Sequence, residues 1–531
     1  MKNKKCGFLQ ISPVGRPGRL TSPPARHAKG HKFPLPALNF GGKNGMLYWL
    51  KYALGKECPP LETRTVRISP ADVERQRELC EKIYERSAAL PTPPLAFVDT
   101  YGCQQNEADS ERIRGYLRAM GYGFTTDENA ADVIVINTCA IREHAEDRVL
   151  GNVGALVHSK RRHPGQIICL CGCMAQEEHV AEKIRQSYRH VDIVFGPHAL
   201  WRFPELLYRV LTRRGRVFDA NDEPGVIAEG IPTVRQNAVK GWVSIMYGCN
   251  NFCTYCVVPY VRGRERSRQP EDVLSEVREM VAAGYKDITL LGQNVNSYGK
   301  DLGLSTDFAD LLEQVNAIPG EFLIRFMTSH PKDASQKLFE TMARCEKVAP
   351  VFHLPFQSGN DRVLKAMNRH YDRAGYLDKV RRLREQIPHV VITSDVIVGF
   401  PGETTEEFED TLSLVEEVGF DALFTFIFSP RVGTPAAEMD DPTPMEENKA
   451  NFQRLVDAQN AISARKHAAY IGKTVRCLLD APSDEPGFAL SARTPGNRLV
   501  RVEAGDPTLV GTFRDVEITG ANTWSLWGKL K

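Results

Sequence analysis

Three cysteines, Cys249, Cys253 and Cys256, lie within eight residues of one another in the segment MYGCNNFCTYCVVPY. Thiolates spaced so closely can bind one four-iron, four-sulfur cluster, and three of them leave one iron without a protein ligand. That iron can accept a small bidentate ligand, such as the amino and carboxylate groups of S-adenosylmethionine. A structural zinc ion normally takes four protein ligands, and the sequence nearby offers no fourth, so we favour the cluster.

Three further cysteines end short apolar runs at regular intervals. The runs LAFVDTYGC, ADVIVINTC and QIICLCGC finish at Cys103, Cys139 and Cys173, which are 36 and 34 residues apart. Each interval fits one βαβ unit, and strands alternating with helices predict a parallel sheet. The three thiols would then lie at the carboxyl ends of strands, where open α/β sheets place their ligand sites.

The third cysteine of this set has an alternative. Cys169, Cys171 and Cys173 alternate along one run and therefore share one face of an extended strand. Cys173 lies at the end of the run and is our first choice as a cluster ligand, with Cys171 as the alternative. The other cysteines have no partner at a suitable spacing and are interpreted as structural or free: Cys6, Cys58, Cys80, Cys345 and Cys477.

Two amphipathic helices are expected around the first strand. Residues 70–90 predict one, in which Cys80 is a packing residue. Residues 109–122 predict another, with apolar residues on one face and Asp109 or Ser110 as its N-cap.

A second series of strands and helices follows a connector at about residues 221–240. Six strand-like runs alternate with helical patterns such as 270–284 and 405–419, which predicts a partial parallel barrel with its site at the carboxyl ends of the strands. The runs are 241–249, 287–294, 322–330, 351–357, 390–400 and 421–430.

Polar residues near the ends of these runs are candidates to bind S-adenosylmethionine or the substrate. Tyr255 stands between two cluster cysteines and can shield the cluster or simply pack. The remaining candidates are equally well explained as turn or buried polar residues: Gln293, Asn294, Ser329, His330, Gln357, Ser358 and Asp395.

A row of arginines suggests contact with nucleic acid. Arg262, Arg264, Arg266 and Arg268 alternate, so in an extended segment their guanidiniums would lie on one side and could contact phosphates. A solvated surface is the alternative, and the nearness of Cys256 favours RNA.

Short strand-like runs in the last part of the chain predict a small antiparallel barrel. Its eight Lys and Arg and seven Asp and Glu make it nearly neutral.

Composition excludes several protein classes. The chain has 531 residues, of which 42% are apolar and 25% charged, and 13 cysteines. No run approaches the roughly 18 apolar residues of a membrane span. The apolar core of a signal peptide is missing after the basic start. An odd number of cysteines argues against complete disulfide pairing, so we expect reduced thiols and a cytoplasmic protein.

The charge is unevenly distributed. Residues 1–56 hold eleven Lys and Arg and no acidic residue, so the remainder carries 57 basic against 66 acidic residues, a net charge of −9. Residues 1–45 are rich in Pro and Gly and are predicted to be disordered. This head can be a nucleic-acid arm, a targeting segment or an extension upstream of a start at Met46.

Longer motifs around these cysteines resemble the radical-SAM methylthiotransferases, and within them the MiaB type. The resemblance covers about residues 95–530 and leaves the head outside. Its motifs are YGCQQNEADSE, VINTCAIRE, GCMAQEE, MYGCNNFCTYCVVPYVRGRERSR, RFMTSHPKD, HLPFQSGND and DVIVGFPGETTEEF.

This resemblance implies two [4Fe–4S] clusters. One is held by the three cysteines of the 249–256 loop, and an auxiliary cluster is held by Cys103, Cys139 and Cys173. S-adenosylmethionine would serve as radical source and methyl donor. The implied reaction converts N6-(dimethylallyl)adenosine next to the anticodon of tRNA to its 2-methylthio derivative. The implied partners are tRNA and a flavodoxin- or ferredoxin-like electron donor, while the sulfur donor stays open; we expect a monomer without membrane contact.

The resemblance also names the parts of the multidomain α/β chain. They are a basic extension with one helix (1–93), an N-terminal parallel α/β domain with the auxiliary cluster (94–225), a radical-SAM partial (β/α)6 barrel (235–466) and a TRAM-like RNA-binding barrel (467–531). RNA binding by this last barrel is implied by the family resemblance, with base stacking available from Phe513, Trp524 or Trp527.

Two alternative functions remain. A sibling enzyme would methylthiolate N6-threonylcarbamoyladenosine in tRNA or an aspartate of a ribosomal protein. A protein of another class would bind zinc and RNA without catalysis.

Overall fold

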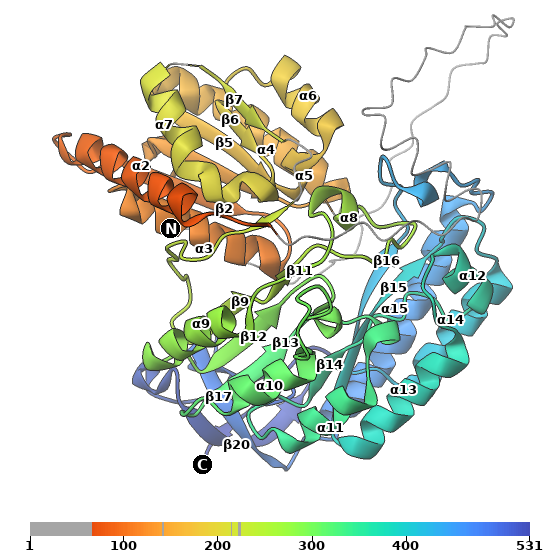
Figure 1. The fold of residues 1–531 in the computed structure, drawn as a ribbon. Helices are drawn as coiled ribbons and strands as arrows, with labels where there is room; N and C mark the ends of the chain where they lie inside the picture. Colours follow the sequence, from red (N-terminus) through yellow and green to blue (C-terminus); the bar gives the residue numbers. More distant parts are fainter. Residues whose placement is uncertain (1–65, 141–142, 214, 221–224) are drawn as a thin grey trace, which may run out of the picture. The chain divides into compact units, whose positions relative to one another are not determined.

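The computed structural model describes residues 66–140, 143–213, 215–220 and 225–531 (Figure 1). Residues 1–65, which include the basic head, Cys6, Met46 and Cys58, lie outside the described residues, and so do the predictions made for them. No helix among the described residues is long and apolar enough to cross a membrane.

The first α/β part is built on a six-stranded parallel sheet in which the strand order is β3-β2-β4-β5-β6-β7. All residues of the two central strands β4 and β5 are buried. Their Val, Ile and Leu side chains point to both faces because helices cover both. The strands are β2 (Leu95–Thr100), β3 (Gly123–Phe124), β4 (Val133–Thr138), β5 (Ile167–Gly172), β6 (Ile193–Phe195) and β7 (Val217–Asp219).

Two apolar clusters fill the spaces between this sheet and its helices. One joins Val133 and Val135 to residues of α2 (Pro70–Ala88), α3 (Gln104–Ala119) and α7 (Phe203–Arg213). The other joins alternate residues of the same strands to α4 (Glu143–Arg162) and α6 (Glu178–Ser187). Cys80 is buried in the first cluster, so its predicted packing role is confirmed.

The helix after β2 begins earlier than predicted. Cys103 has extended backbone angles and is the N-cap of α3, whose first residue is Gln104. The prediction that Asp109 or Ser110 caps this helix is wrong, because both lie inside it and are buried. The Ser110 hydroxyl accepts a hydrogen bond from Thr100 at 2.8 Å instead.

The second α/β part contains six parallel strands in two three-stranded sheets, in the orders β9-β12-β13 and β14-β15-β16. One apolar cluster runs through both sheets and their helices. The strands are β9 (Lys240–Ser244), β12 (Asp287–Leu291), β13 (Leu323–Phe326), β14 (Val351–His353), β15 (Val391–Val398) and β16 (Ala422–Ile427). The principal helices outside the strands are α9 (Pro270–Ala282), α10 (Phe308–Asn316), α11 (Gln336–Arg344), α13 (Arg373–Gln386) and α14 (Thr405–Val418).

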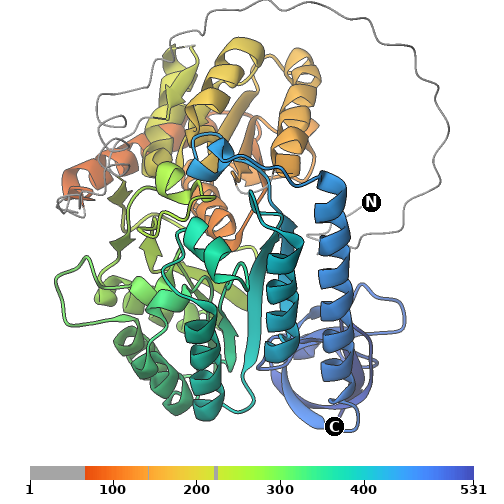
Figure 2. The same ribbon diagram turned by 90° about the vertical axis from the view of Figure 1, so that its right-hand side faces the viewer.

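Local chemistry explains where α14 begins. The Thr404 hydroxyl accepts from the Glu407 backbone N–H, and the Glu407 carboxylate accepts from the Thr404 N–H, which forms a capping box. The long helix α15 (Met445–Ala468) packs beside α14 (Figure 2). Arg454 of α15 pairs with Glu409 of α14 at 2.6 Å.

A closed five-stranded barrel ends the chain, with the strand order β17-β18-β19-β21-β20. The predicted multidomain α/β fold with a small terminal barrel is therefore confirmed, but the barrel is not wholly antiparallel as predicted, because β19 and β21 pair in parallel. The strands are β17 (Thr474–Pro482), β18 (Leu490–Arg493), β19 (Leu499–Val502), β20 (Phe513–Ala521) and β21 (Leu526–Leu530).

Candidate functional site

The loop with the three closely spaced cysteines runs from β10 (Met246–Tyr247) to the short helix α8 (Val258–Val261). The backbone N–H of Cys249 donates to Gly263 O at 3.1 Å, and that of Cys256 donates to Cys253 O at 2.9 Å. Burial raises the pKa of the Cys249 thiol to about 12, and Cys253 adds to the effect. The three sulfurs therefore share one enclosed loop, where thiolates need a compensating positive charge such as iron.

A buried arginine supplies positive charge at this loop. The Arg369 guanidinium donates to Cys253 Sγ at 3.3 Å, to Pro355 O at 2.8 Å and to Tyr371 Oη at 3.0 Å. Only 4% of the surface of Arg369 is exposed. Sequence reasoning missed Arg369, because it lies in a polar turn after α12 (Asp361–Ala366) with no motif spacing to the cysteines.

The other three cysteines converge at one edge of the parallel sheet. Thr138 at the end of β4 is paired with Gly172 at the end of β5, so the residues that follow, Cys139 and Cys173, lie side by side. Gly102, the residue before Cys103, packs closely against Cys139. A Cβ placed on Gly102 would stand 2.5 Å from Cys139 Cβ, so a side chain at position 102 would push the two segments apart. Cys103 in turn raises the pKa of the Cys173 thiol, which burial has already raised, to about 11.

The structure separates the two candidates for the third ligand. Cys171 and Cys169 point into the apolar cluster beneath α3 and α7. Cys173 is the first residue of α5 (Cys173–Gln176) and contacts Val257 and Val261 at the cysteine loop. This arrangement favours Cys173 over Cys171 as the ligand.

Arg262 extends from the segment that follows the cysteine loop to Cys173 of the second cysteine group. It follows α8, and its Nε donates to Cys173 Sγ at 3.0 Å. Its Nη2 donates to Asp109 Oδ2 at 2.9 Å. A buried guanidinium thus lies against the second thiol group, as Arg369 lies against the first.

Neither cysteine group is spaced like the ligands of a single metal ion. Within residues 66–531, apart from the short gaps, no three His, Cys, Asp or Glu side chains are placed to hold one ion. Three thiolates leave one iron of a four-iron cluster without a protein ligand, whereas a structural zinc ion normally takes four protein ligands.

Several polar side chains at the barrel's strand ends are buried with atoms that have no hydrogen-bond partner among the described residues. They are Asn294 Oδ1, Ser329 Oγ and His330 Nε2. The Asn294 amide donates to Asp333 at 2.8 Å, which orients the unpaired oxygen. Unpaired buried polar atoms are costly, so these groups fit a face that binds a polar cofactor such as S-adenosylmethionine.

Three other predicted cofactor residues, Gln357, Ser358 and Asp395, make contacts within the protein. Gln357 has a left-handed backbone (φ 66°), and its N–H donates to Asp395 O at 3.0 Å. Asp395 Oδ2 lies 3.5 Å from His353 Nε2. The Ser358 hydroxyl contacts Thr411 of α14 at 3.3 Å, so it is directed toward that helix.

Two predicted residues lie near the loop and the second strand end. Tyr255 packs against an apolar cluster that includes Phe400, and burial raises the pKa of its phenol. Gln293 is half-buried and lies two residues after the end of β12. Their roles toward the cofactor stay predictions.

The row of alternating arginines does not form one exposed side, so that structural expectation is wrong. Arg262, Arg266 and Arg268 are buried, with 4%, 7% and 3% of their surfaces exposed. A turn at Gly263 (φ 74°) interrupts the extended segment, and Arg268 is held by Glu229 at 2.7 Å. Arg264 alone of the four is half-buried, with its guanidinium 4.2 Å from the centre of the Phe252 ring.

Three family models match successive parts of the chain. The radical SAM superfamily matches residues 243–415. The uncharacterized protein family UPF0004 matches residues 96–196, and the TRAM domain matches residues 468–531. The first match contains the 249–256 loop, and the second contains Cys103, Cys139 and Cys173.

Curated relatives match over nearly their whole lengths. The tRNA-2-methylthio-N(6)-dimethylallyladenosine synthase of Acetivibrio thermocellus is 47% identical over 88% of this chain and 98% of its own. The synthase of Alkaliphilus oremlandii is 48% identical over 88% of this chain and 98% of its own, and that of Clostridium perfringens 49% identical over 82% and 97%. The chain therefore belongs to the tRNA-2-methylthio-N(6)-dimethylallyladenosine synthase family of radical-SAM transferases.

Proposed function

We propose that this chain adds a methylthio group to carbon 2 of N6-(dimethylallyl)adenosine next to the anticodon of tRNA. The observation that carries the proposal is identity of 47–49% to curated synthases over nearly their full lengths. The presence of both cysteine groups within the matched length supports it.

The packing of the two cysteine groups supports a reaction that needs both. Cys173 and Ala140 from the sheet edge form one apolar cluster with Val257 and Val261 from the cysteine loop and α8. Arg262 extends from the end of α8 to Cys173. Two cofactors held by these groups would be close enough to act on one substrate.

We assign one [4Fe–4S] cluster to Cys249, Cys253 and Cys256, and the auxiliary cluster to Cys103, Cys139 and Cys173. The cluster with bound S-adenosylmethionine supplies the radical chemistry that breaks an unactivated C–H bond. The chain's own contribution is to enclose these groups, to place Arg369 and Arg262 against the thiols, and to direct Asn294, Ser329 and His330 toward the cofactor face.

We assign contact with the RNA to two side chains that are not buried, Arg264 and Trp524. Arg264 lies over Phe252 beside the cysteine loop. Trp524 in the terminal barrel is 72% exposed, a large apolar surface suited to stacking on a base. An electron donor of the flavodoxin or ferredoxin class would complete the system.

The test uses the anaerobically reconstituted chain with S-adenosylmethionine, dithionite and one of two tRNAs. One tRNA carries N6-(dimethylallyl)adenosine and the other N6-threonylcarbamoyladenosine, and mass spectrometry of the nucleosides identifies the product. The proposal expects the 2-methylthio product only from the first tRNA, and none from Cys249→Ala. Product from the second tRNA alone would support the sibling enzyme instead.

A further inference from the structure

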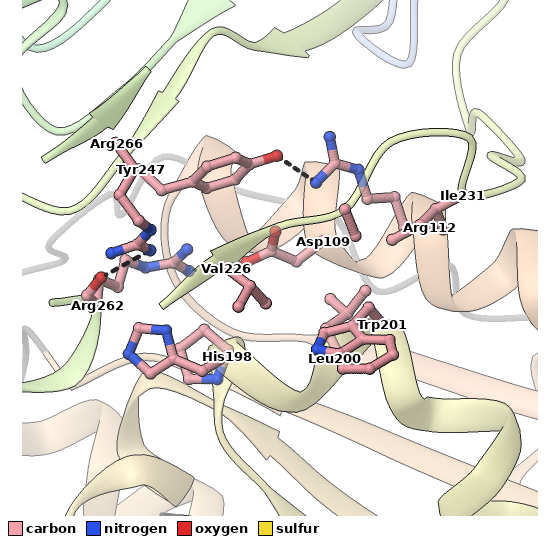
Figure 3. A pocket seen from close by; sticks show the side chains of 12 residues that line it. Asp109, Arg112, His198, Leu200, Trp201, Val226, Ile231, Tyr247, Arg262 and Arg266 are labelled. Carbon is pink, nitrogen blue, oxygen red and sulfur yellow. Dashed lines mark hydrogen bonds and ion pairs between the residues drawn. The ribbon is translucent and has the colours of Figure 1, made fainter. Parts of the chain in front are cut away.

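A small pocket lies beside the auxiliary cysteines, and Arg262 is the one of its described lining residues that the function proposed above uses. It has a volume of about 40 Å³ and is walled by α3, by residues 197–201, by the strand β8 (Val226–Ile227) and by the turn before β11 (Arg266–Ser267). Figure 3 shows three guanidiniums, one imidazole and one phenol around it, which belong to Arg112, Arg262, Arg266, His198 and Tyr247.

Arg266 is the least compensated of these groups. It is 93% buried, since 7% of its surface is exposed, and it forms no ion pair with a carboxylate among the described residues. Its Nη atoms donate to the carbonyl oxygens of Arg264 at 2.8 Å and Arg262 at 3.2 Å, while its Nε has no partner in the described chain. Burial lowers the pKa of Arg266 to about 10, as expected for a cation without a counter-ion.

The remaining walls also offer donors. Arg112 donates one hydrogen bond of 2.5 Å to Tyr247 Oη. The two carboxylates that attract it, Asp109 and Glu276, form their ion pairs with Arg262 and Arg268 among the described residues. Arg262 uses its Nε and Nη2 on Cys173, Asn106 and Asp109. Each guanidinium carries five N–H donors, so all three keep donors that these bonds do not use.

The nearby carboxylates are already engaged. Asp109, the one acidic residue among the described residues that line the pocket, is paired with Arg262 at 2.9 Å. Glu276 is shared by Arg268 at 2.6 Å and Arg235 at 2.8 Å. Burial and the two guanidiniums of Arg266 and Arg262 lower the pKa of His198 to about 4, so its imidazole is neutral near pH 7. Positive charge in the pocket therefore exceeds negative charge among the described groups.

We propose that this pocket binds one phosphate-class oxyanion, held by Arg266, Arg112 and Arg262. Guanidinium forks match the oxygens of such an anion, and their charge-assisted hydrogen bonds are strong. The pocket volume of about 40 Å³ is enough for about three water molecules, since each needs about 10–15 Å³. A single phosphate group is therefore the right size, and a whole nucleotide is too large.

The anion can come from two sources, which are free inorganic phosphate and a backbone phosphate of the RNA substrate. Anion binding does not depend on the methylthiolation proposed above, although the two share Arg262, whose Nε donates to Cys173 Sγ at 3.0 Å. A failed anion test would leave the function proposed above standing.

The test is equilibrium dialysis of radiolabelled inorganic phosphate against the full, cluster-reconstituted chain in a phosphate- and sulfate-free buffer. The wild type should bind one phosphate per chain, and its thermal unfolding midpoint should rise with phosphate concentration. Arg266→Met and Arg112→Met should each weaken binding at least about tenfold, because each removes charged hydrogen bonds. Arg278→Met, which removes an exposed guanidinium paired with Glu271, is the matched control and should bind as the wild type does.

Addition of an anticodon stem-loop RNA distinguishes the sources. Displacement of labelled phosphate by the RNA identifies a backbone phosphate as the ligand, and undisturbed binding identifies the free ion. Arg112 is partly exposed, so its variant keeps the test valid if Arg266→Met does not fold. Absence of saturable phosphate binding to the wild type, or equal binding by Arg112→Met, overturns the proposal.

Discussion

Removal of the buried cation at the cysteine loop should change the reduction potential of the cluster that we assign there. Arg369 donates to Cys253 Sγ at 3.3 Å and is 4% exposed, so water screens its charge poorly. Arg369→Met removes this charge while keeping a similar apolar stem. Because the cation stabilises the reduced, more negative cluster, the variant should have the lower potential.

The size of the shift follows from Coulomb's law. A unit charge about 5 Å from the cluster's added electron interacts by about 3 kcal/mol at an effective dielectric constant of about 20. For a one-electron couple about 59 mV corresponds to about 1.4 kcal/mol, so the expected decrease is roughly 120 mV.

The assay is a potentiometric titration followed by electron paramagnetic resonance, on protein in which the auxiliary cysteines are replaced so that one cluster reports. Arg369→Lys keeps the charge and should move the potential by less than half as much. Arg278→Met, an exposed guanidinium on α9, should not move it. An Arg369→Met potential equal to that of the wild type, with the cluster fully loaded, would refute this account of Arg369.

Three further predictions concern the ligand choice, RNA binding and stability. Cys173→Ala should lose the auxiliary cluster and with it about four irons per chain. Cys171→Ala should keep the cluster, because Cys171 lies in the apolar core. Iron analysis of the two variants tests this choice of ligand. Trp524→Ala should weaken tRNA binding by about 1–3 kcal/mol in a filter-binding assay with an unchanged unfolding midpoint, since the side chain is 72% exposed. Although burial opposes it, Arg268 and other guanidiniums lower the pKa of Glu276 to about 2. A carboxyl group whose pKa is lowered on folding stabilises the fold at pH values above its unfolded pKa of about 4.3, and this stabilisation is lost as the pH falls toward about 2. Glu276→Gln should therefore lower the free energy of unfolding, measured by urea denaturation, by about 3 kcal/mol at pH 7 and by progressively less below about pH 4.

Regular spacing predicted the architecture well. Short, nearly continuous runs of Val, Ile and Leu, such as those that form β4 and β5, are typical of strands covered by helices on both faces. This pattern can be recognised in the sequence alone. The same regularity placed Cys103, Cys139 and Cys173 at strand ends, and the register of β4 with β5 brings the last two together.

Sequence spacing failed where long-range contacts decide. Alternation suggested four arginines on one surface, but a turn at Gly263 interrupts the row and three of the four are buried. Asp109 and Glu229 hold Arg262 and Arg268 in the interior, while Arg266 is buried without a described carboxylate partner. Arg369 gave no signal at all, because its contact with Cys253 joins residues 116 positions apart.

The most direct test of the central claim is the iron and sulfide content of the anaerobically reconstituted chain and of two triple-alanine variants, one for each cysteine group. The account predicts about eight irons and eight sulfides for the wild type and about four of each for either variant. Reductive cleavage of S-adenosylmethionine should survive only in the variant that keeps Cys249, Cys253 and Cys256. Zinc without iron, or an unchanged iron content in either variant, would contradict the account.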